Sequence, residues 1–143
     1  MDEIKIQQVI HRFANSFDLK DWQGLGDCFT ERIYTDYSDL RGTLPETMDA
    51  KHYIHLRQEA LSGLKTHHLC SNHEIGIKQD KADCRTSMVI FRSGPNRQDN
   101  FTTHCIYTFN LQKINSAWKI TGIIQKVIWN EGDPSIHRGV KQK

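Results

Sequence analysis

The hydrophobic positions near the start of the chain repeat with the period of an α-helix. Steps of three and one residues place them on a single helix face, which carries Ile6, Val9, Ile10, Phe13, Ala14 and Phe17. Asp2 precedes this face and is the predicted N-cap. The polar run of residues 18–21 breaks the pattern, and Asp21 is positioned to cap a second, short helix over residues 22–28. A third helix is predicted from Thr47 or Asp49 to Leu61, because Gly63 is a typical stop signal.

From Thr66 onward the chain changes from helical periodicity to long runs that favour β-strands. The predicted strands cover residues 69–77, 82–92, 101–113 and 117–129, after an earlier extended segment at 31–39. Short turns join these long runs, so we expect an antiparallel and strongly twisted sheet. Helices followed by strands are typical of the α+β class. We expect one domain over residues 1–130 and a polar, frayed tail over residues 131–143.

The composition fits one globular domain and argues against several classes of partner. The chain has 143 residues, of which 37% are hydrophobic, so it can bury its own core. Its 19 Lys and Arg residues nearly balance 17 Asp and Glu residues, which argues against nucleic acid or an anionic membrane. No apolar run reaches the roughly 18 residues of a transmembrane helix. The first residues lack the order of a signal peptide and the four cysteines lack CxxC spacing, so we expect reduced thiols in the cytoplasm.

Histidine is unusually abundant, with eight residues, and this raises the question of a metal site. His52 and His55 lie on the third predicted helix, and His67, His68, Cys70 and His73 gather just after it. Neighbouring residues of a strand point to opposite faces, so His67 and His68 do not share a site. Because no HxxxH or paired CxxC motif is present, we expect neither a metal nor a cofactor.

Four short motifs, in their order and spacing, resemble a known family. They are Phe17–Trp22 at the end of the first helix, Tyr34–Ser38, Thr66–Asn72 at the entry to the sheet, and Ala117–Gly122 in the last strand. Together they resemble the SnoaL-like group of the nuclear transport factor 2-like superfamily, which includes scytalone dehydratase and hexachlorocyclohexane dehydrochlorinase. The resemblance covers residues 4–130. It implies a cone-shaped α+β fold, in which three N-terminal helices pack on a strongly curved antiparallel sheet and enclose a pocket.

The resemblance also implies a catalytic pair. In both lyases an aspartate just after the first helix holds a histidine that acts as the base, and Asp18 and His68 match these residues. A carboxylate beside an imidazole fixes one tautomer, so that the other ring nitrogen can take a proton. Tyr37 matches a tyrosine that polarises the substrate oxygen in the dehydratase. The alternative is structural: Asp18 caps a helix, His68 is a half-buried satisfied residue, and Tyr37 packs with its hydroxyl at a wet edge.

Several positions depart from the two lyases, so neither substrate transfers to this chain. Phe17 stands where the dehydratase has a tyrosine, and Arg92 stands where it has a second histidine. Cys105 and Tyr107 replace a serine and an asparagine of the dehydratase. Phe13 replaces a lysine of the dehydrochlorinase.

Strand parity and the resemblance together indicate which side chains line the pocket. Alternate residues of a strand point to one face, and the face in question is largely apolar on the last three strands. The expected substrate-binding residues are Phe17, Trp22, Tyr53, Met88, Arg92, Cys105, Tyr107, Ile123, Gln125 and Val127. Arg92 is the only fixed positive charge expected there, near the mouth of the pocket. The alternative for Arg92 is a solvated strand end.

Two functions follow from these interpretations. The first is a cofactor-free lyase or isomerase, in which His68 removes a proton from a small apolar or aromatic substrate while Tyr37 and Arg92 stabilise negative charge. The second is a non-catalytic module of the same fold, which binds a small ligand or supports a larger assembly. We also expect a homodimer through the outer sheet face, because Val89, Phe91 and Ile106 would form an apolar patch there.

Overall fold

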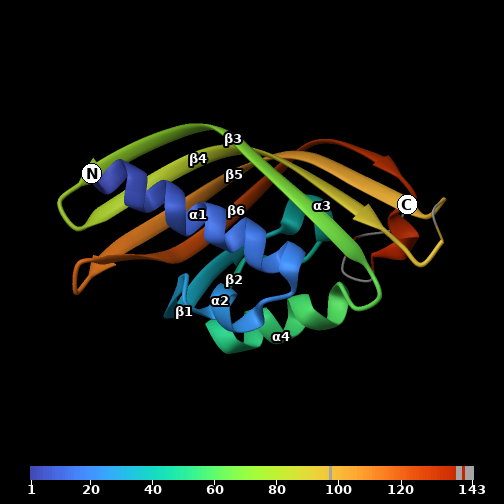
Figure 1. Ribbon diagram of the computed structural model, residues 1–143, viewed down its shortest axis with the longest axis horizontal. Coiled ribbons are helices and arrows are strands. Elements are labelled where there is room, and N and C mark those ends of the chain that lie inside the picture. Colours follow the sequence, from blue (N-terminus) through green and yellow to red (C-terminus); the bar gives the residue numbers. More distant parts are fainter. Residues whose placement is uncertain (97, 138–139, 141–143) are drawn as a thin grey trace.

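A computed structural model describes residues 1–96, 98–137 and 140 of the chain (Figure 1). The elements in chain order are α1 (Asp2–Leu19), α2 (Trp22–Gly26), β1 (Phe29–Asp36), α3 (Ser38–Arg41), β2 (Glu46–Asp49), α4 (Ala50–Ala60), β3 (Lys65–Lys78), β4 (Lys81–Ser93), β5 (Asn100–Ile114), β6 (Ala117–Gly132) and the 3₁₀ turn η1 (Pro134–Ile136). The predicted α+β class is confirmed.

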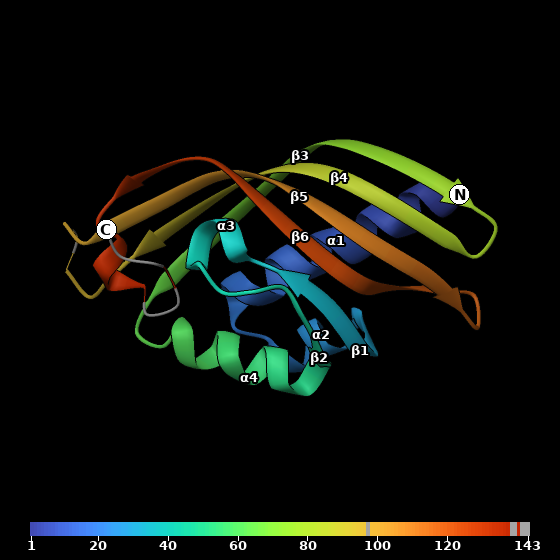
Figure 2. The same cartoon turned by 180° about the vertical axis from the view of Figure 1, so that it is seen from behind.

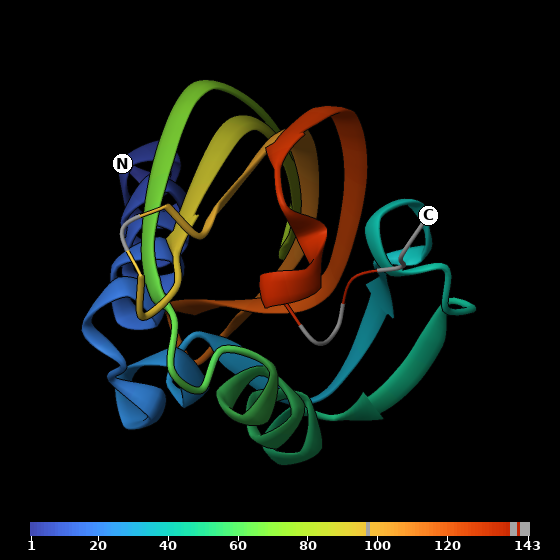
Figure 3. The same ribbon diagram turned by 90° about the vertical axis from the view of Figure 1, so that its right-hand side faces the viewer.

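The six strands form one curved sheet in the order β2-β1-β6-β5-β4-β3. Seen along the strands, β3 to β6 curl into an arch, with α1 along one side and α4 beneath the open edge (Figure 3). All neighbouring strands are antiparallel except β1 and β6, which run parallel (Figure 2). The antiparallel pairing predicted for the long strands is confirmed, and the parallel pair of β1 and β6 is an exception that the sequence did not predict. Two-residue turns join β3 to β4 and β5 to β6, and residues 94–99 join β4 to β5, so these neighbours run antiparallel. In contrast, β1 and β6 are distant in sequence and no turn sets their direction.

Helix α1 forms one side of the hydrophobic core and packs against the inner face of the curved sheet. Its buried face carries Ile6, Ile10, Phe13, Ala14 and Phe17, as the periodicity predicts. Phe13 is fully buried, and its ring packs edge-on against Phe17, Phe29, Tyr107 and Phe109 at centroid distances of 5.0 to 6.1 Å. The contacts with Tyr107 and Phe109 place α1 across the inner face of β5, and α1 also packs against β3.

The segment before α4 differs from the sequence prediction. Residues 46–49 form strand β2, so the third predicted helix begins at Ala50 and not at Thr47. The short helix α3 precedes β2, and its first two residues fall in the segment 31–39 that was predicted to be extended. Strand β2 forms because it pairs antiparallel with β1 and satisfies the backbone groups of an otherwise open sheet edge.

The C-terminal segment is ordered further than the sequence analysis expected. Strand β6 runs to Gly132, η1 follows, and His137 and Val140 are 2% and 7% exposed. Val140 packs with Leu40 and Phe101 in a small second core. The expectation of a frayed tail is therefore wrong for residues 131–137 and 140, because His137 and Val140 are buried, whereas residues 138–139 and 141–143 lie outside the described part of the chain.

The alternation predicted for the long strands is confirmed. On β4, Cys84, Thr86, Met88, Ile90 and Arg92 are buried, whereas the residues between them are exposed or half-buried. Strand β5 repeats this pattern. Val89 and Ile106 are half-buried and Phe91 is exposed on the outer face, where the homodimer stays a prediction. In the described part of the chain, no helix has the length and apolar character needed to cross a membrane.

Candidate functional site

A small pocket lies between the inner face of the sheet and helix α4. Its walls come from α1, α3, α4, strands β3 to β6 and the segment after η1, and its volume is about 30 Å³. A cavity of about 150 Å³ admits benzene. This pocket therefore fits a small chemical group as it stands, and a larger ligand requires its side chains to move.

The aspartate and histidine that the resemblance pairs are in contact. Nδ1 of His68 lies 2.6 Å from Oδ1 of Asp18, and the backbone N–H of His68 donates to Oδ2 at 2.8 Å. The hydroxyl of Thr66 donates to Oδ1 at 3.0 Å. Asp18 lies in the last turn of α1, where a carboxylate does not cap the helix. Helix α2 is capped by Asp21 instead, whose Oδ1 accepts from the backbone N–H of Gly24, so the capping alternative for Asp18 is wrong.

These contacts set the tautomer of His68. Because the Asp18 carboxylate only accepts hydrogen bonds, Nδ1 carries the proton that it shares with Oδ1, and Nε2 is the unprotonated nitrogen of a neutral ring. His68 lines the pocket, and the ring of Phe17 stacks on it at a centroid distance of 5.3 Å. Burial lowers the pKa of His68 from 6.5, although Asp18 raises it, and nearby Arg92 lowers it further. The ring is therefore neutral at pH 7, as a general base must be.

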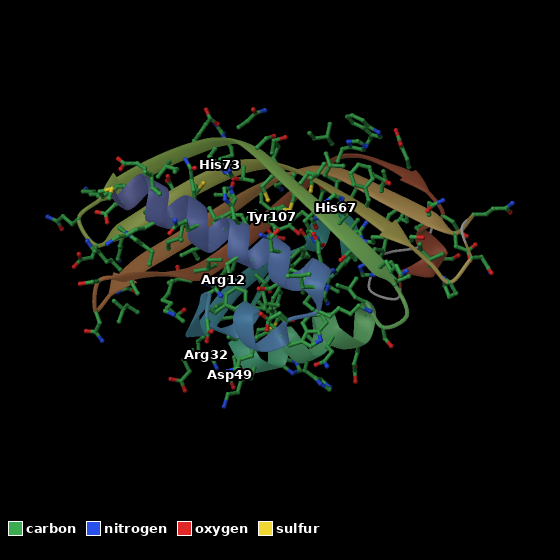
Figure 4. All side chains as sticks on the ribbon, viewed as in Figure 1. Arg12, Arg32, Asp49, His67, His73 and Tyr107 are labelled. Carbon is green, nitrogen blue, oxygen red and sulfur yellow. The ribbon has the colours of Figure 1, made fainter. Side chains whose placement is uncertain are left out.

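Three tyrosines also line the pocket, Tyr37, Tyr53 and Tyr107. The hydroxyls of Tyr37 and Tyr53 lie 2.7 Å apart in the interior, and the ring of Tyr107 packs edge-on to Tyr37 (Figure 4 shows Tyr107 behind α1). Burial raises the pKa of all three phenols, so they remain protonated at neutral pH. Within the Tyr37–Tyr53 pair one hydroxyl donates to the other, and the accepting hydroxyl keeps its own proton, which it can donate to an oxygen that gains negative charge.

Three arginines and a second histidine complete the pocket. Arg92 is 4% exposed and donates to the hydroxyl of Thr103 at 2.8 Å, and Arg41 and Arg57 also line the pocket. This decides against a solvated strand end for Arg92. It also shows that the expectation of a single positive charge is wrong. Burial, together with the charges of Arg92 and Arg41, lowers the pKa of His137 to about 3, so this ring is neutral at pH 7.

The model of the SnoaL-like domain family matches residues 1–123 of the chain. This chain belongs to the SnoaL-like family. Scytalone dehydratase PfmaJ from Pestalotiopsis fici is 24% identical to it over 92% of this chain and 75% of the relative. The crystal structure of Kfla4162 from Kribbella flavida has a TM-score of 0.87 at 18% identity and covers 91% of this chain and 93% of its own. The hexachlorocyclohexane dehydrochlorinase LinA-type3 from Novosphingobium barchaimii has a TM-score of 0.78 at 12% identity, over 95% and 92% of the two chains.

The two structural likenesses establish the nuclear transport factor 2-like α+β fold of this SnoaL-like domain. The sequence resemblance to the SnoaL-like group is therefore confirmed, together with its curved sheet and N-terminal helices.

The SnoaL-like domain brings together most of the residues singled out from sequence. Those that line the pocket are Phe17, Tyr37, Tyr53, His68, Arg92, Tyr107 and Gln125, and Asp18 lies directly behind His68. Those that do not line it are Trp22, Met88, Cys105, Ile123 and Val127. Met88, Cys105 and Ile123 pack in the main core, and Trp22 packs edge-on to Phe17. Strand parity gave Met88, Cys105 and Ile123 the correct face, but only part of that face lines the pocket.

Sequence reasoning missed Arg41, Arg57 and His137 as pocket residues. Arg57 carried a detectable signal, because it falls on the buried face of α4 with Ala50, Tyr53 and Ala60. Arg41 lies at the end of α3, which was not predicted, and His137 lies in the tail that was expected to be frayed.

The remaining histidines do not build a metal site in the described residues. His67 is exposed and His68 is buried, on opposite faces of β3 as predicted, and His67 lies on the outer side in Figure 4. No group of three or more His, Cys, Asp or Glu side chains suited to a metal ion occurs among residues 1–96, 98–137 and 140.

Proposed function

We propose that this SnoaL-like domain is a cofactor-free lyase, in which His68 removes a proton from a carbon atom of a small substrate. One observation carries the proposal: Asp18 holds Nδ1 of His68 at 2.6 Å, which leaves Nε2 as the basic nitrogen of a pocket-lining ring. The curated relatives that carry the name scytalone dehydratase support the same reaction class.

The elimination proceeds without any group from outside the chain. Nε2 of His68 takes the proton, and the electron pair of the broken C–H bond forms a C=C bond as the C–O bond of a neighbouring hydroxyl breaks. A tyrosine hydroxyl, from Tyr37 or Tyr53, donates its proton to the departing oxygen, which leaves as water. The proton held by His68 then restores the tyrosine. Asp18 orients the ring and stabilises the imidazolium that exists between the two transfers.

The volume of the pocket favours a second candidate, a non-catalytic module that binds a small ligand. A space of about 30 Å³ holds only a small group without movement of side chains. Under this interpretation His68 and the tyrosines contribute hydrogen bonds to the ligand, and no bond of the ligand is broken.

Deuterium exchange distinguishes the two functions before the natural substrate is identified. The probes are 4-hydroxy-2-butanone, 4-hydroxy-2-oxobutanoate and scytalone, incubated with the protein in D₂O and followed by NMR at the carbon beside the carbonyl group. The lyase predicts that His68→Ala slows exchange of at least one probe by about 10²-fold or more. His52→Ala, a change at an exposed histidine of α4, serves as the matched control and leaves the rate unchanged. Equal rates for the wild-type protein and His68→Ala on every probe would contradict the lyase.

A further inference from the structure

Three guanidinium groups converge on one end of the pocket. Cζ of Arg41 lies 4.1 Å from the centroid of the Tyr37 ring, and Cζ of Arg57 lies 5.8 Å from the same centroid. Arg57 also lies 5.8 Å from the ring of Tyr53, and Arg92 lies 5.0 Å from the ring of Phe101. Arginine stays protonated in proteins, so this end of the pocket carries three positive charges against a wall of aromatic rings.

Two of these three groups lack hydrogen-bond partners that buried arginines normally have. Arg57 is 7% exposed, and among the residues that the structure describes its Nε and Nη1 have no hydrogen-bond partner, nor does Nε of Arg41. In the described residues, no carboxylate lies within 4.0 Å of Arg41, Arg57 or Arg92. The arginines that do form ion pairs there are Arg32 and Arg85, both of which are exposed.

An unpaired charge in the interior is unfavourable unless an anion compensates it. Burial of an ion costs several kcal/mol, and removal of its counter-ion leaves that cost unopposed. The carboxylate behind His68, that of Asp18, does not serve this purpose, because its oxygens already accept hydrogen bonds from Thr66 and His68. The arrangement is therefore that of a binding site for an anion supplied from solution.

We infer that Arg57 and Arg41, with Arg92, bind the carboxylate group of a small organic acid in this pocket. A carboxylate is planar and matches the fork of a guanidinium, which donates two parallel hydrogen bonds to it. It is also small enough for a volume of about 30 Å³, whereas the rest of the acid extends towards His68 and the tyrosines. The reaction of the bound acid rests on the proposed function, whereas binding of its carboxylate group does not require turnover.

Binding of acetate, measured by calorimetry or NMR titration, tests the inference directly. Acetamide has nearly the same shape without the charge and serves as the matched probe. Acetate is expected to bind the wild-type protein at least ten times more tightly than acetamide, and Arg57→Met is expected to weaken acetate binding at least tenfold. Arg32→Met removes an exposed arginine that pairs with Asp49 at the sheet edge (Figure 4), and it leaves acetate binding unchanged.

Thermal unfolding without ligand separates a binding role from a packing role for Arg57. If its charge is uncompensated until an anion arrives, Arg57→Met unfolds at the same or a higher temperature than the wild-type protein. If Arg57→Met does not fold, Arg41→Met is the variant that tests the inference. It replaces a half-buried arginine, and acetate binding is expected to weaken tenfold in it as well.

Three outcomes would overturn the inference. They are equal binding of acetate and acetamide, unchanged acetate binding in both arginine variants, and tighter binding of phosphate or sulfate than of any carboxylate tested. His68→Ala is expected to retain acetate binding. Loss of exchange activity with intact acetate binding therefore concerns the proposed function, and loss of acetate selectivity concerns the anion site.

Discussion

Asp18 contacts His68 twice, through Nδ1 of the imidazole at 2.6 Å and through the backbone N–H at 2.8 Å. Both contacts join the last turn of α1 to the start of β3, so one carboxylate fixes both the position of the strand and the tautomer of the ring. Thr66, two residues before His68 on the same strand, adds a third hydrogen bond to the same carboxylate. The ring therefore cannot rotate without breaking an anchor between helix and sheet.

The first prediction is that Asp18 and His68 act as one unit in the exchange reaction. His68→Ala slows exchange by about 10²-fold or more while the fold persists, and Asp18→Asn loses most of the activity, because an amide permits the other tautomer. The double variant is only slightly less active than His68→Ala alone, since residues that serve one proton transfer are strongly non-additive. Exchange rates of the four proteins measure this, and multiplicative losses in the double variant would contradict it.

The second prediction concerns the acidic limb of the pH–rate profile. The base must be neutral, and burial lowers the pKa of His68 from 6.5, so activity persists at pH values where an exposed histidine is already protonated. Asp18→Asn removes the contact that raises this pKa, so the residual activity of the variant falls off at a lower pH than that of the wild-type protein. Exchange rates from pH 4 to pH 8 measure the acidic limb of the wild-type protein and that of Asp18→Asn. A limb that moves to higher pH in Asp18→Asn would show that His68 is not the titrating base.

The third prediction is a loss of stability in acid that depends on His137. The pKa of this residue is lowered to about 3, so between pH 6.5 and pH 3 the unfolded chain binds a proton that the folded chain does not. The free energy of unfolding therefore falls as pH falls through this window, by up to about 1.4 kcal/mol per pH unit. Replacement by a neutral ring in His137→Phe flattens the dependence. Urea titrations at several pH values measure it, with His52→Phe as the exposed control.

A fourth prediction addresses the turn that leads from β6 to η1. Gly132 has φ +96°, and a Cβ at this position would collide with the carbonyl oxygen of Asn100. Gly132→Ala therefore displaces the segment that holds His137, and it costs about 1–3 kcal/mol from backbone strain alone. In Gly26→Ala the new Cβ meets Cδ1 of Ile54 at 3.5 Å, an ordinary contact, so stability is unchanged or higher. Equal unfolding free energies for the two variants would contradict this account.

The fifth prediction is that the thiols react slowly in the folded protein. Burial raises the pKa of Cys28 and Cys70 to about 12 and that of Cys105 to about 11, and it also raises the pKa of Cys84. Little reactive thiolate is therefore present at pH 8. Ellman's reagent should titrate four thiols after unfolding, with Cys70 the first to react before it, because this side chain alone is only half-buried. Two fast thiols in the folded protein would refute this.

The local pattern of the chain determined the elements and the faces that they bury. Helical periodicity located α1 and its buried face. Alternation along β4 and β5 showed which side chains point inward, over residues 84–92 and 103–109. Both patterns can be recognised in the sequence because they follow from local backbone geometry and from the exclusion of water. The motifs around Asp18 and His68 indicated the pair that the structure brings into contact. Asp18 and His68 are 50 residues apart in the sequence, and only the resemblance paired them, because no local pattern predicts a contact over that separation.

Tertiary contacts decided what the local pattern left open. The parallel pairing of β1 with β6 has no turn to specify it, and β2 exists only because β1 offers an open edge. Arg57 and Arg41 come from α4 and α3, and His137 follows η1, so their convergence with Arg92 of β4 depends on how four distant segments pack. The positive charge of the pocket therefore depends on contacts between segments that are far apart in the sequence. The order of hydrophobic and polar residues along the chain does not reveal such contacts.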